Sequence, residues 1–283
     1  SYHQGYGSSD DIMEGLHKNL PKDSVNLITF FMDSKRRSLQ QYLDSITNNI
    51  LDSIIKIQPH LLLLSDDNAV NYLTRHPELV SGDLSHLPIV FCGVNWSAEK
   101  YNLPEERVTG MLEVLPLKQL IDTVKKYIPK TKNMMVLTEN SNSAKNNKAI
   151  LDTMYRNAGF VPSYYMVSDF EEWKKAFLIA NDSMDLIYLP TNGAIKNWQD
   201  LDAQMLIWDS IKIPVITCDD FMMPYAVYGL TKVAKEQGEW AAETLMRLLF
   251  ENVKVDEIPI TKNKNLEEFI NVELARKINF KIN

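Results

Sequence analysis

The strongest constraint on the fold is a run of four leucines, residues 61–64, followed at once by Ser65, Asp66, Asp67 and Asn68. A strand that is apolar on both faces is typical of a parallel sheet packed between helices. Ligands of open α/β sheets bind outside the carboxyl ends of the strands, so this abrupt polar cluster predicts a binding site. The alternative is that the two aspartates only form a turn and cap the helix that follows.

Apolar strands and amphipathic helices alternate along the whole chain in two similar series. The strands are expected at residues 25–32, 61–64, 87–94 and 107–114, then at 133–137, 163–167, 184–189 and 213–217, with a short strand near 257–260. The chain opens in a polar loop, residues 1–9, directly before a helix, so we expect a preceding first strand to lie outside this numbering. The alternation predicts βαβ units with right-handed crossovers, and therefore an α/β fold with parallel sheets.

Length and charge exclude several classes of protein. A chain of 283 residues is long enough for roughly two domains. Its net charge of −7 and its scattered basic residues argue against nucleic acid as a partner. No apolar segment approaches the roughly 20 residues of a membrane span. The two cysteines, Cys92 and Cys218, lack zinc-site spacing, and a disulfide between them is compatible with the sequence but not predicted.

The sequence favours binding over catalysis. It contains no G-x-S-x-G, H-E-x-x-H or P-loop motif, and no G-x-G-x-x-G follows a strand. Of the five histidines, only His3 lies in a loop where it could reach a site. We therefore expect a protein that is not an enzyme, with no cofactor and no metal.

Polar and aromatic residues at the predicted strand ends suggest how a small molecule would be held. Carboxylates at Asp66, Asp67, Asp219 and Asp220 are candidates to receive an ammonium group. Backbone amides at the helix starts near Asp10, Ala69 and Ser143 are candidates to receive a carboxylate, because the helix dipole favours anions there. Aromatic side chains near these positions could wall an apolar group, although core packing explains each of them equally well. These aromatic residues are Tyr2, Tyr6, Trp96, Phe221 and Tyr225.

An ordered set of motifs covers essentially the whole chain. The motifs are SYHQGYGSSDDIMEGL (1–16), SDDNAVNYL (65–73), FCGVNW (91–96), VTGMLE (108–113), LTENSNSA (137–144), IYLPTNGAI (187–195), IPVITCDD (213–220), GEWAAETLMRLLF (238–250) and FINVELARKINFKI (269–282). Together they resemble extracytoplasmic binding proteins of the type I periplasmic fold, in the ABC-transporter substrate-binding branch that includes tryptophan- and tyrosine-binding lipoproteins.

The resemblance implies two Rossmann-like lobes with parallel sheets, joined by three hinge crossovers around a small enclosed ligand. The crossovers are expected near Glu113, residues 221–224 and Val255. The N-terminal lobe would hold residues 1–113 plus 224–255, and the C-terminal lobe residues 114–223 plus 256–283. The expected ligand-binding residues are Tyr2, Tyr6, Ser9, Asp10, Asp66, Asp67, Asn95 and Trp96 from the first lobe, and Glu139, Asn140, Ser143, Thr191, Asn192, Asp219 and Asp220 from the second.

We therefore expect an extracytoplasmic solute-binding protein that serves ABC uptake with a membrane permease. Its small-molecule ligand would be an amino acid or another amine-bearing solute, since acidic groups are many and no arginine cluster is present. One alternative is the ligand-sensing domain of a membrane histidine kinase or similar receptor, which the SYH-x-GY opening resembles. Two further alternatives are an α/β enzyme acting on a small metabolite and a repressor-type effector domain, which would need a helix-turn-helix before residue 1.

Overall fold

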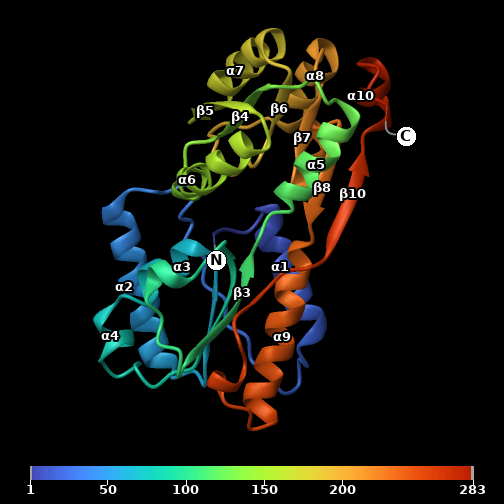
Figure 1. The fold of residues 1–283 in the computed structure, drawn as a ribbon. Helices are drawn as coiled ribbons and strands as arrows, with labels where there is room; N and C mark the ends of the chain where they lie inside the picture. Colours follow the sequence, from blue (N-terminus) through green and yellow to red (C-terminus); the bar gives the residue numbers. More distant parts are fainter. Residues whose placement is uncertain (1, 282–283) are drawn as a thin grey trace. The chain divides into compact units, whose positions relative to one another are not determined.

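The computed structural model describes residues 2–281; Ser1, Ile282 and Asn283, which belong to the predicted opening loop and tail, lie outside the described residues. The chain forms two compact α/β units, each with its own sheet (Figure 1). Unit 1 comprises Ser1–Val114 and Val233–Lys264, and unit 2 comprises Leu115–Lys232 and Asn265–Asn283. The chain therefore passes between the units three times, and the predicted two-lobed α/β fold with parallel sheets is confirmed.

Unit 1 is built on a parallel sheet whose described strands run in the order β1-β2-β3-β9. Its elements are α1 (Gly7–Asn19), α2 (Gln40–Ile57), β1 (Leu62–Ser65), α3 (Asp67–Leu73), α4 (Pro77–Val80), β2 (Ile89–Asn95), η1 (Glu99–Tyr101), β3 (Val108–Glu113), α9 (Ala234–Phe250), η3 (Val255–Glu257) and β9 (Thr261–Lys262). Apolar side chains of α2 and α3 cover one face of this sheet, and those of α1 and α9 cover the other. Both faces of β1 are thus covered, as its leucine run predicts.

Helices α1 and α9 lie side by side in unit 1 (Figure 1). Two glycines allow their backbones to approach closely. A Cβ atom on Gly238 would lie 1.9 Å from the carbonyl oxygen of Ile12, and one on Gly15 would lie 2.4 Å from that of Lys235. The absence of a side chain at these positions therefore sets the distance between the two helices.

Unit 2 contains a larger sheet in the order β10-β8-β7-β6-β4-β5, parallel except for β10. Its elements are α5 (Leu117–Tyr127), β4 (Asn133–Glu139), α6 (Asn142–Asn157), β5 (Val161–Val167), α7 (Phe170–Ser183), β6 (Leu186–Tyr188), α8 (Asp200–Ser210), β7 (Val215–Thr217), η2 (Asp220–Tyr225), β8 (Tyr228–Lys232), β10 (Leu266–Ile270) and α10 (Val272–Lys277). Strands β7, β6 and β4 are neighbours, so their carboxyl ends lie along one edge of the sheet.

Two predicted strands are wrong. Residues 25–32 are extended but form no strand, because no described strand lies beside them to share backbone hydrogen bonds. The short strand near 257–260 is replaced by η3 and by β9, which pairs with β3.

The crossings between the units also lie later in the chain than residues 221–224 and Val255. Strand β8 pairs with β7 and keeps the chain in unit 2 up to Lys232, whereas β9 keeps it in unit 1 up to Lys264. Sheet pairing, rather than the turn-forming sequence at 221–224, fixes these points.

Candidate functional site

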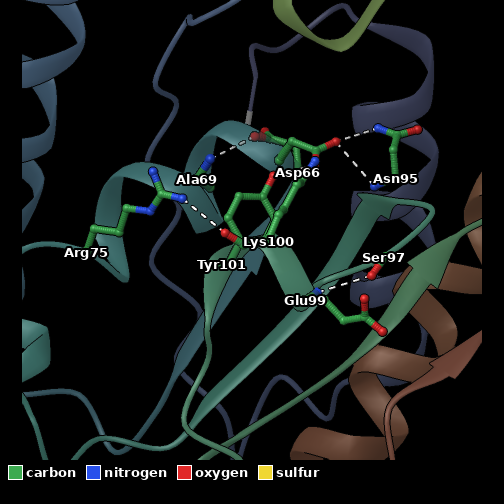
Figure 2. Close-up of polar contacts among 9 residues, drawn as sticks. Asp66, Ala69, Arg75, Asn95, Ser97, Glu99, Lys100 and Tyr101 are labelled. Atoms are coloured by element: carbon green, nitrogen blue, oxygen red, sulfur yellow. Dashed lines mark hydrogen bonds and ion pairs between the residues drawn. The ribbon is translucent and has the colours of Figure 1, made fainter. Parts of the chain in front are cut away.

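In unit 1 the polar residues predicted at strand ends gather where β1, β2 and β3 finish. Asp66 follows β1, and Asn95 ends β2 (Figure 2). Asp67 is the next residue and begins α3. The backbone amide of the next residue, Trp96, donates to the carbonyl oxygen of Glu113 at the end of β3, with an N···O distance of 3.0 Å. The structure therefore brings these first-lobe candidates together at one sheet edge.

The carboxylate of Asp67 is committed to contacts inside unit 1. One oxygen accepts from the backbone and side-chain amides of Asn95, at 3.2 and 2.6 Å. The other accepts from the Lys100 ammonium at 3.0 Å and from the Tyr101 hydroxyl at 2.5 Å. Burial and the Asp67 charge together raise the pKa of Tyr101, which keeps that hydroxyl a donor. Asp67 therefore joins α3, β2 and η1, a positioning role that sequence reasoning missed.

Asp66 is also buried, but its environment differs. Its Oδ1 atom accepts the amide of Ala69 at 2.9 Å and so caps α3 (Figure 2). Burial raises the pKa of this carboxyl from 3.8 to about 6. Its backbone has a φ of 92°, and Trp96 has a φ of 65°. Such left-handed values are uncommon outside glycine, and they concentrate at binding sites, where surrounding structure holds the strain.

The raised pKa of Asp66 predicts a specific pH dependence of stability. Because the folded pKa exceeds the ordinary value of 3.8, the folded protein binds this proton more tightly than the unfolded chain does. The resulting stabilisation is complete below pH ~4 and is lost as the pH rises through about 6. We expect Asp66→Asn, which stays neutral and keeps a capping oxygen, to match the wild type at pH 4 and to exceed its free energy of unfolding by about 2 kcal/mol at pH 7.

The measurement is urea denaturation of both proteins between pH 4 and pH 7, monitored on unit 1. Asp66→Ser, which is also neutral and able to cap a helix, is the matched control and should show the same trend with pH. A difference between wild type and Asp66→Asn that does not change with pH would contradict the assignment.

A buried aromatic and cationic cluster lies at the start of unit 1. The rings of Tyr2 and Tyr6 meet edge to face, with centroids 5.6 Å apart. The ammonium of Lys35, only 7% exposed, lies 4.9 and 4.3 Å from these ring centroids and 2.8 Å from the Tyr6 hydroxyl. His3 packs against Tyr6, with ring centroids 5.6 Å apart. Burial raises the pKa of the Tyr2 hydroxyl, and the negative charges of Asp66 and Asp67 act in the same direction.

Lys35 is not among the binding residues that the sequence predicts. The sequence analysis counted it only among the basic residues that argue against nucleic acid as a partner. Its place just after the extended segment 25–32 was the available signal.

The three helix starts named as candidates for an anion differ in the structure. Ser141 caps α6 by accepting the amide of Ala144 at 3.2 Å, and Asp66 caps α3. Helix α1 begins at Gly7 and has no side-chain cap at its N-cap residue, Tyr6. Ser9 and Asp10 lie in its first turn, where both Asp10 oxygens accept the amide of Gly5 at 3.1 and 3.0 Å. Of the three helix starts, that of α1 is the one whose N-cap residue makes no side-chain capping hydrogen bond.

In unit 2 the predicted residues follow β4, β6 and β7. Glu139 is fully buried: one oxygen accepts the amide of Ala194 and the other the hydroxyl of Ser141, each at 2.8 Å. It therefore holds the loop after β6, which carries Thr191 and Asn192, beside the start of α6. Those two loop residues are half-buried. They remain more accessible than the carboxylate that positions them.

Two further unit 2 candidates lie at the start of α6. Asn140 is exposed, and its side-chain amide lies 3.4 Å from the Ser168 hydroxyl. The Ser143 hydroxyl lies 3.1 Å from that of Ser141. Together with Thr191 and Asn192, they place amide and hydroxyl groups along one edge of the unit 2 sheet.

The two aspartates after β7 have different roles. Asp219 forms an ion pair with Lys232 at 2.9 Å, and both side chains are 5% exposed. Its charge is therefore balanced within unit 2. Asp220 is half-buried, and its Oδ1 atom accepts the amide of Phe221 at 2.8 Å. Of the two carboxylates, only that of Asp220 retains appreciable exposure.

The cysteines contribute no exposed thiol to either sheet edge. Cys92 and Cys218 are free and buried, and burial raises the pKa of Cys92 to about 12. Within residues 2–281, no group of three His, Cys, Asp or Glu side chains is arranged to hold a metal ion. Over the same residues, no helix is long and apolar enough to cross a membrane.

Solved structures with the same fold are numerous. An ABC domain from Streptococcus pneumonia, solved in complex with L-Trp, is 16% identical, with 99% of this chain and 93% of that chain covered and a TM-score of 0.74. A conserved domain protein from Vibrio cholerae is also 16% identical, with 98% and 92% covered and a TM-score of 0.75. A ligand-free, open substrate-binding protein with adhesive properties from Clostridium difficile is 17% identical, with 98% and 90% covered and a TM-score of 0.59. No curated protein sequence matches this chain.

The fold is that of the type I periplasmic binding proteins. The model of the family of ABC transporter substrate binding proteins matches residues 74–283. The chain belongs to this family, which confirms the resemblance drawn from its motifs, and it is a solute-binding protein.

Proposed function

We propose that this protein is the extracytoplasmic binding component of an ABC uptake system and that its solute is an amino acid, with an aromatic one the first candidate. The two units would close on the solute by a hinge motion at the three crossings. A ligand that contacts both units stabilises the closed state relative to the open state. The partner is then a membrane permease, which the family match favours over a receptor module.

One observation carries the proposal: in each unit, polar groups collect at the carboxyl ends of neighbouring parallel strands. In open α/β folds this is where ligands bind. In unit 1 the groups are acidic and aromatic, whereas in unit 2 they are mostly amides and hydroxyls. An amino acid has a complementary set of groups: an ammonium, a carboxylate and a side chain.

The chemistry of unit 1 suggests an assignment for each part of the solute. Asp66 would accept the ammonium, because a cation beside a buried carboxylate lowers its pKa and relieves the cost of ionisation. The amides at the start of α1 would receive the carboxylate. Tyr2 and Trp96 would contact the ring of the solute. The similar Streptococcus pneumonia domain was solved with L-Trp, which has these three groups.

In unit 2, the accessible polar groups would complete the contacts. Asn140, Ser143, Thr191 and Asn192 offer donors and acceptors for the main-chain part of the solute, and Asp220 offers a second acceptor for its ammonium. Glu139, Asp67 and Asp219 are then positioning residues, since each carboxylate already has a partner within the protein.

A matched pair of tryptophan variants tests the proposal. Trp96 is half-buried at the end of β2, and we expect Trp96→Ala to weaken binding of L-tryptophan at least about tenfold, because stacked aromatic contact is lost. Trp208→Ala removes a 45% exposed indole from α8 of unit 2 and should leave binding unchanged. Isothermal titration calorimetry measures both affinities, and thermal unfolding checks that each variant is folded.

The solute is identified by a thermal-shift screen of the amino acids and related amines, since a bound solute raises the unfolding temperature by mass action. A shift with sugars alone would overturn the amino-acid assignment while leaving the binding role intact. Turnover of a compound from a metabolite panel, without saturable binding of any amino acid, would instead support an α/β enzyme.

A further inference from the structure

Polar side chains of unit 1 form hydrogen bonds beside each point where the chain crosses between the units. The chain leaves unit 1 after Val114, enters it again at Val233 and leaves it after Lys264. The side chains near one crossing bind backbone groups near another, although the crossings are remote from one another in sequence. The unit 1 ends of the three crossings are therefore joined to one another.

Asn263 joins the first crossing to the third. It follows β9, which pairs in parallel with β3, and its backbone amide continues that pairing by donating to the carbonyl oxygen of Leu112 at 3.2 Å. Its side chain extends the pairing further: Oδ1 accepts the amide of Val114 at 2.7 Å, and Nδ2 donates to the carbonyl oxygen of Val114 at 3.2 Å. A carboxamide carries both an acceptor and a donor, so this single side chain binds both backbone groups of Val114.

The first turn of α9 joins the second crossing to the other two. Glu236 lies in this turn, and both of its carboxylate oxygens accept the amide of Lys264 at 3.0 Å. The next residue, Gln237, is 1% exposed, and its side-chain amide donates to the carbonyl oxygen of Leu112 at 3.2 Å. The Leu112 carbonyl thus accepts from Asn263 and from Gln237, so residues near all three crossings meet at one oxygen atom.

In unit 2 the second and third crossings are joined as well. Lys232 ends β8 and is paired with Leu266 of the antiparallel strand β10, which lies beside β8 (Figure 1). Val233 alone lies between β8 and α9, and Asn265 alone lies between Lys264 and β10. Each of these two crossings is therefore held on both sides of a link that is one residue long.

The first crossing has a similar short link. Leu115 and Pro116 lie between Val114, which the side chain of Asn263 holds, and α5, which begins at Leu117. Hinges consist of a few residues at the ends of elements, which absorb the changes in φ and ψ when two parts of a protein move. The short links at the three crossings have this position in the chain.

We propose that Asn263 and Glu236 form a clasp that joins the three crossings into a single hinge, about which the units turn at residues 115–116, 233 and 265. This inference rests on the proposed closure around a solute. With the clasp intact, the three links bend together. Without it, each link bends by itself, and closing on a solute must then order a larger set of conformations. The clasp therefore raises the affinity for the solute although neither residue contacts it.

Amide hydrogen exchange of the solute-free chain, resolved to single residues by NMR, tests the clasp. Asn263→Ala removes the side chain that binds Val114 but leaves Glu236, the partner of the Lys264 amide, in place. Because the clasp acts as one unit, we expect exchange to become at least about fivefold faster at the amides of both Val114 and Lys264. Glu236→Ala should speed exchange at the same two amides.

Asn271→Ala is the matched control. Asn271 is half-buried, as Asn263 is, and its Oδ1 atom accepts one backbone amide, that of Leu274 in unit 2, at 3.1 Å. Its loss removes a comparable hydrogen bond away from the crossings. Exchange at the amides of Val114 and Lys264 should therefore stay at the wild-type rate.

Isothermal titration calorimetry with L-tryptophan as the probe measures the effect on binding. We expect Asn263→Ala to bind about five- to tenfold more weakly than the wild type, and Asn271→Ala to bind equally well. Asn263→Asp keeps an acceptor for the Val114 amide but loses the donor, so its affinity should be intermediate. Thermal unfolding checks that each variant is folded. A purely structural role would lower the unfolding temperature and leave the affinity of the folded protein unchanged.

Faster exchange at Val114 alone in Asn263→Ala would overturn the clasp, because the crossings would then be held independently. Faster exchange at both amides with wild-type affinity would overturn its role in binding. A wild type that does not bind L-tryptophan would count against the proposed solute only. The exchange measurements need no solute, and the solute found in the thermal-shift screen would then replace L-tryptophan in the titrations.

Discussion

Replacing Lys232 with methionine is expected to lower the free energy of unfolding of unit 2 by about 3–5 kcal/mol. Lys232 ends β8, and its ammonium lies 2.9 Å from the Asp219 carboxylate with both side chains 5% exposed. Methionine fills much of the same volume but leaves the carboxylate buried without its cation. That uncompensated charge is expensive because water cannot replace the lost partner.

A double variant separates the free-energy cost of the unpaired charge from the stabilisation that the ion pair itself contributes. Lys232→Met combined with Asp219→Asn removes both charges, and we expect it to recover most of the lost stability. Lys212→Met is the matched control, since the Lys212–Asp182 pair of unit 2 is 65% and 64% exposed, and its loss should cost under about 1 kcal/mol. Urea denaturation with exchange detection on unit 2 measures all three. A cost for Lys232→Met no larger than that of the control would contradict the buried pairing.

Gly238→Ala is expected to destabilise unit 1 by about 2–4 kcal/mol through overpacking. The new methyl group would lie 1.9 Å from the carbonyl oxygen of Ile12, and backbone cannot yield as a flexible side chain does. Alanine favours a helix interior over glycine by about 1 kcal/mol, so helix propensity alone predicts the opposite sign. The steric cost exceeds the gain in helix propensity because α1 and α9 must move apart. This separation loosens the packing of Leu16 and Leu245 in the core between the two helices.

Glu243→Ala provides the control for this substitution. It places alanine on the exposed side of the same helix and should change the free energy of unfolding by less than about 0.5 kcal/mol. Denaturation of both variants, with exchange measured on α1, compares them. Stabilisation by Gly238→Ala would show that α1 and α9 do not meet at this point.

The local pattern of the chain was enough to predict most of the fold. Residues 61–64 and 87–94 are apolar on both faces and bounded by polar turns, and they lie within or beside β1 and β2 as expected. The sequence of such a strand indicates that it is buried, because each of its side chains must be apolar where helices cover both faces of the sheet. Residues 25–32 show where this reasoning fails. A strand needs a hydrogen-bonded neighbour, and the sequence of one segment does not reveal whether its neighbour is there.

The sequence alone predicts polar groups at the ends of its strands, and the carboxyl ends of neighbouring parallel strands share one edge of a sheet. Which of those groups are already occupied depends on the tertiary structure. Asp67 is satisfied by Lys100 and Tyr101, and Asp219 by Lys232, partners that lie far from them in the chain. A carboxylate committed to the protein and one open to a solute look the same in sequence, because the difference lies in contacts that form only when distant segments fold together.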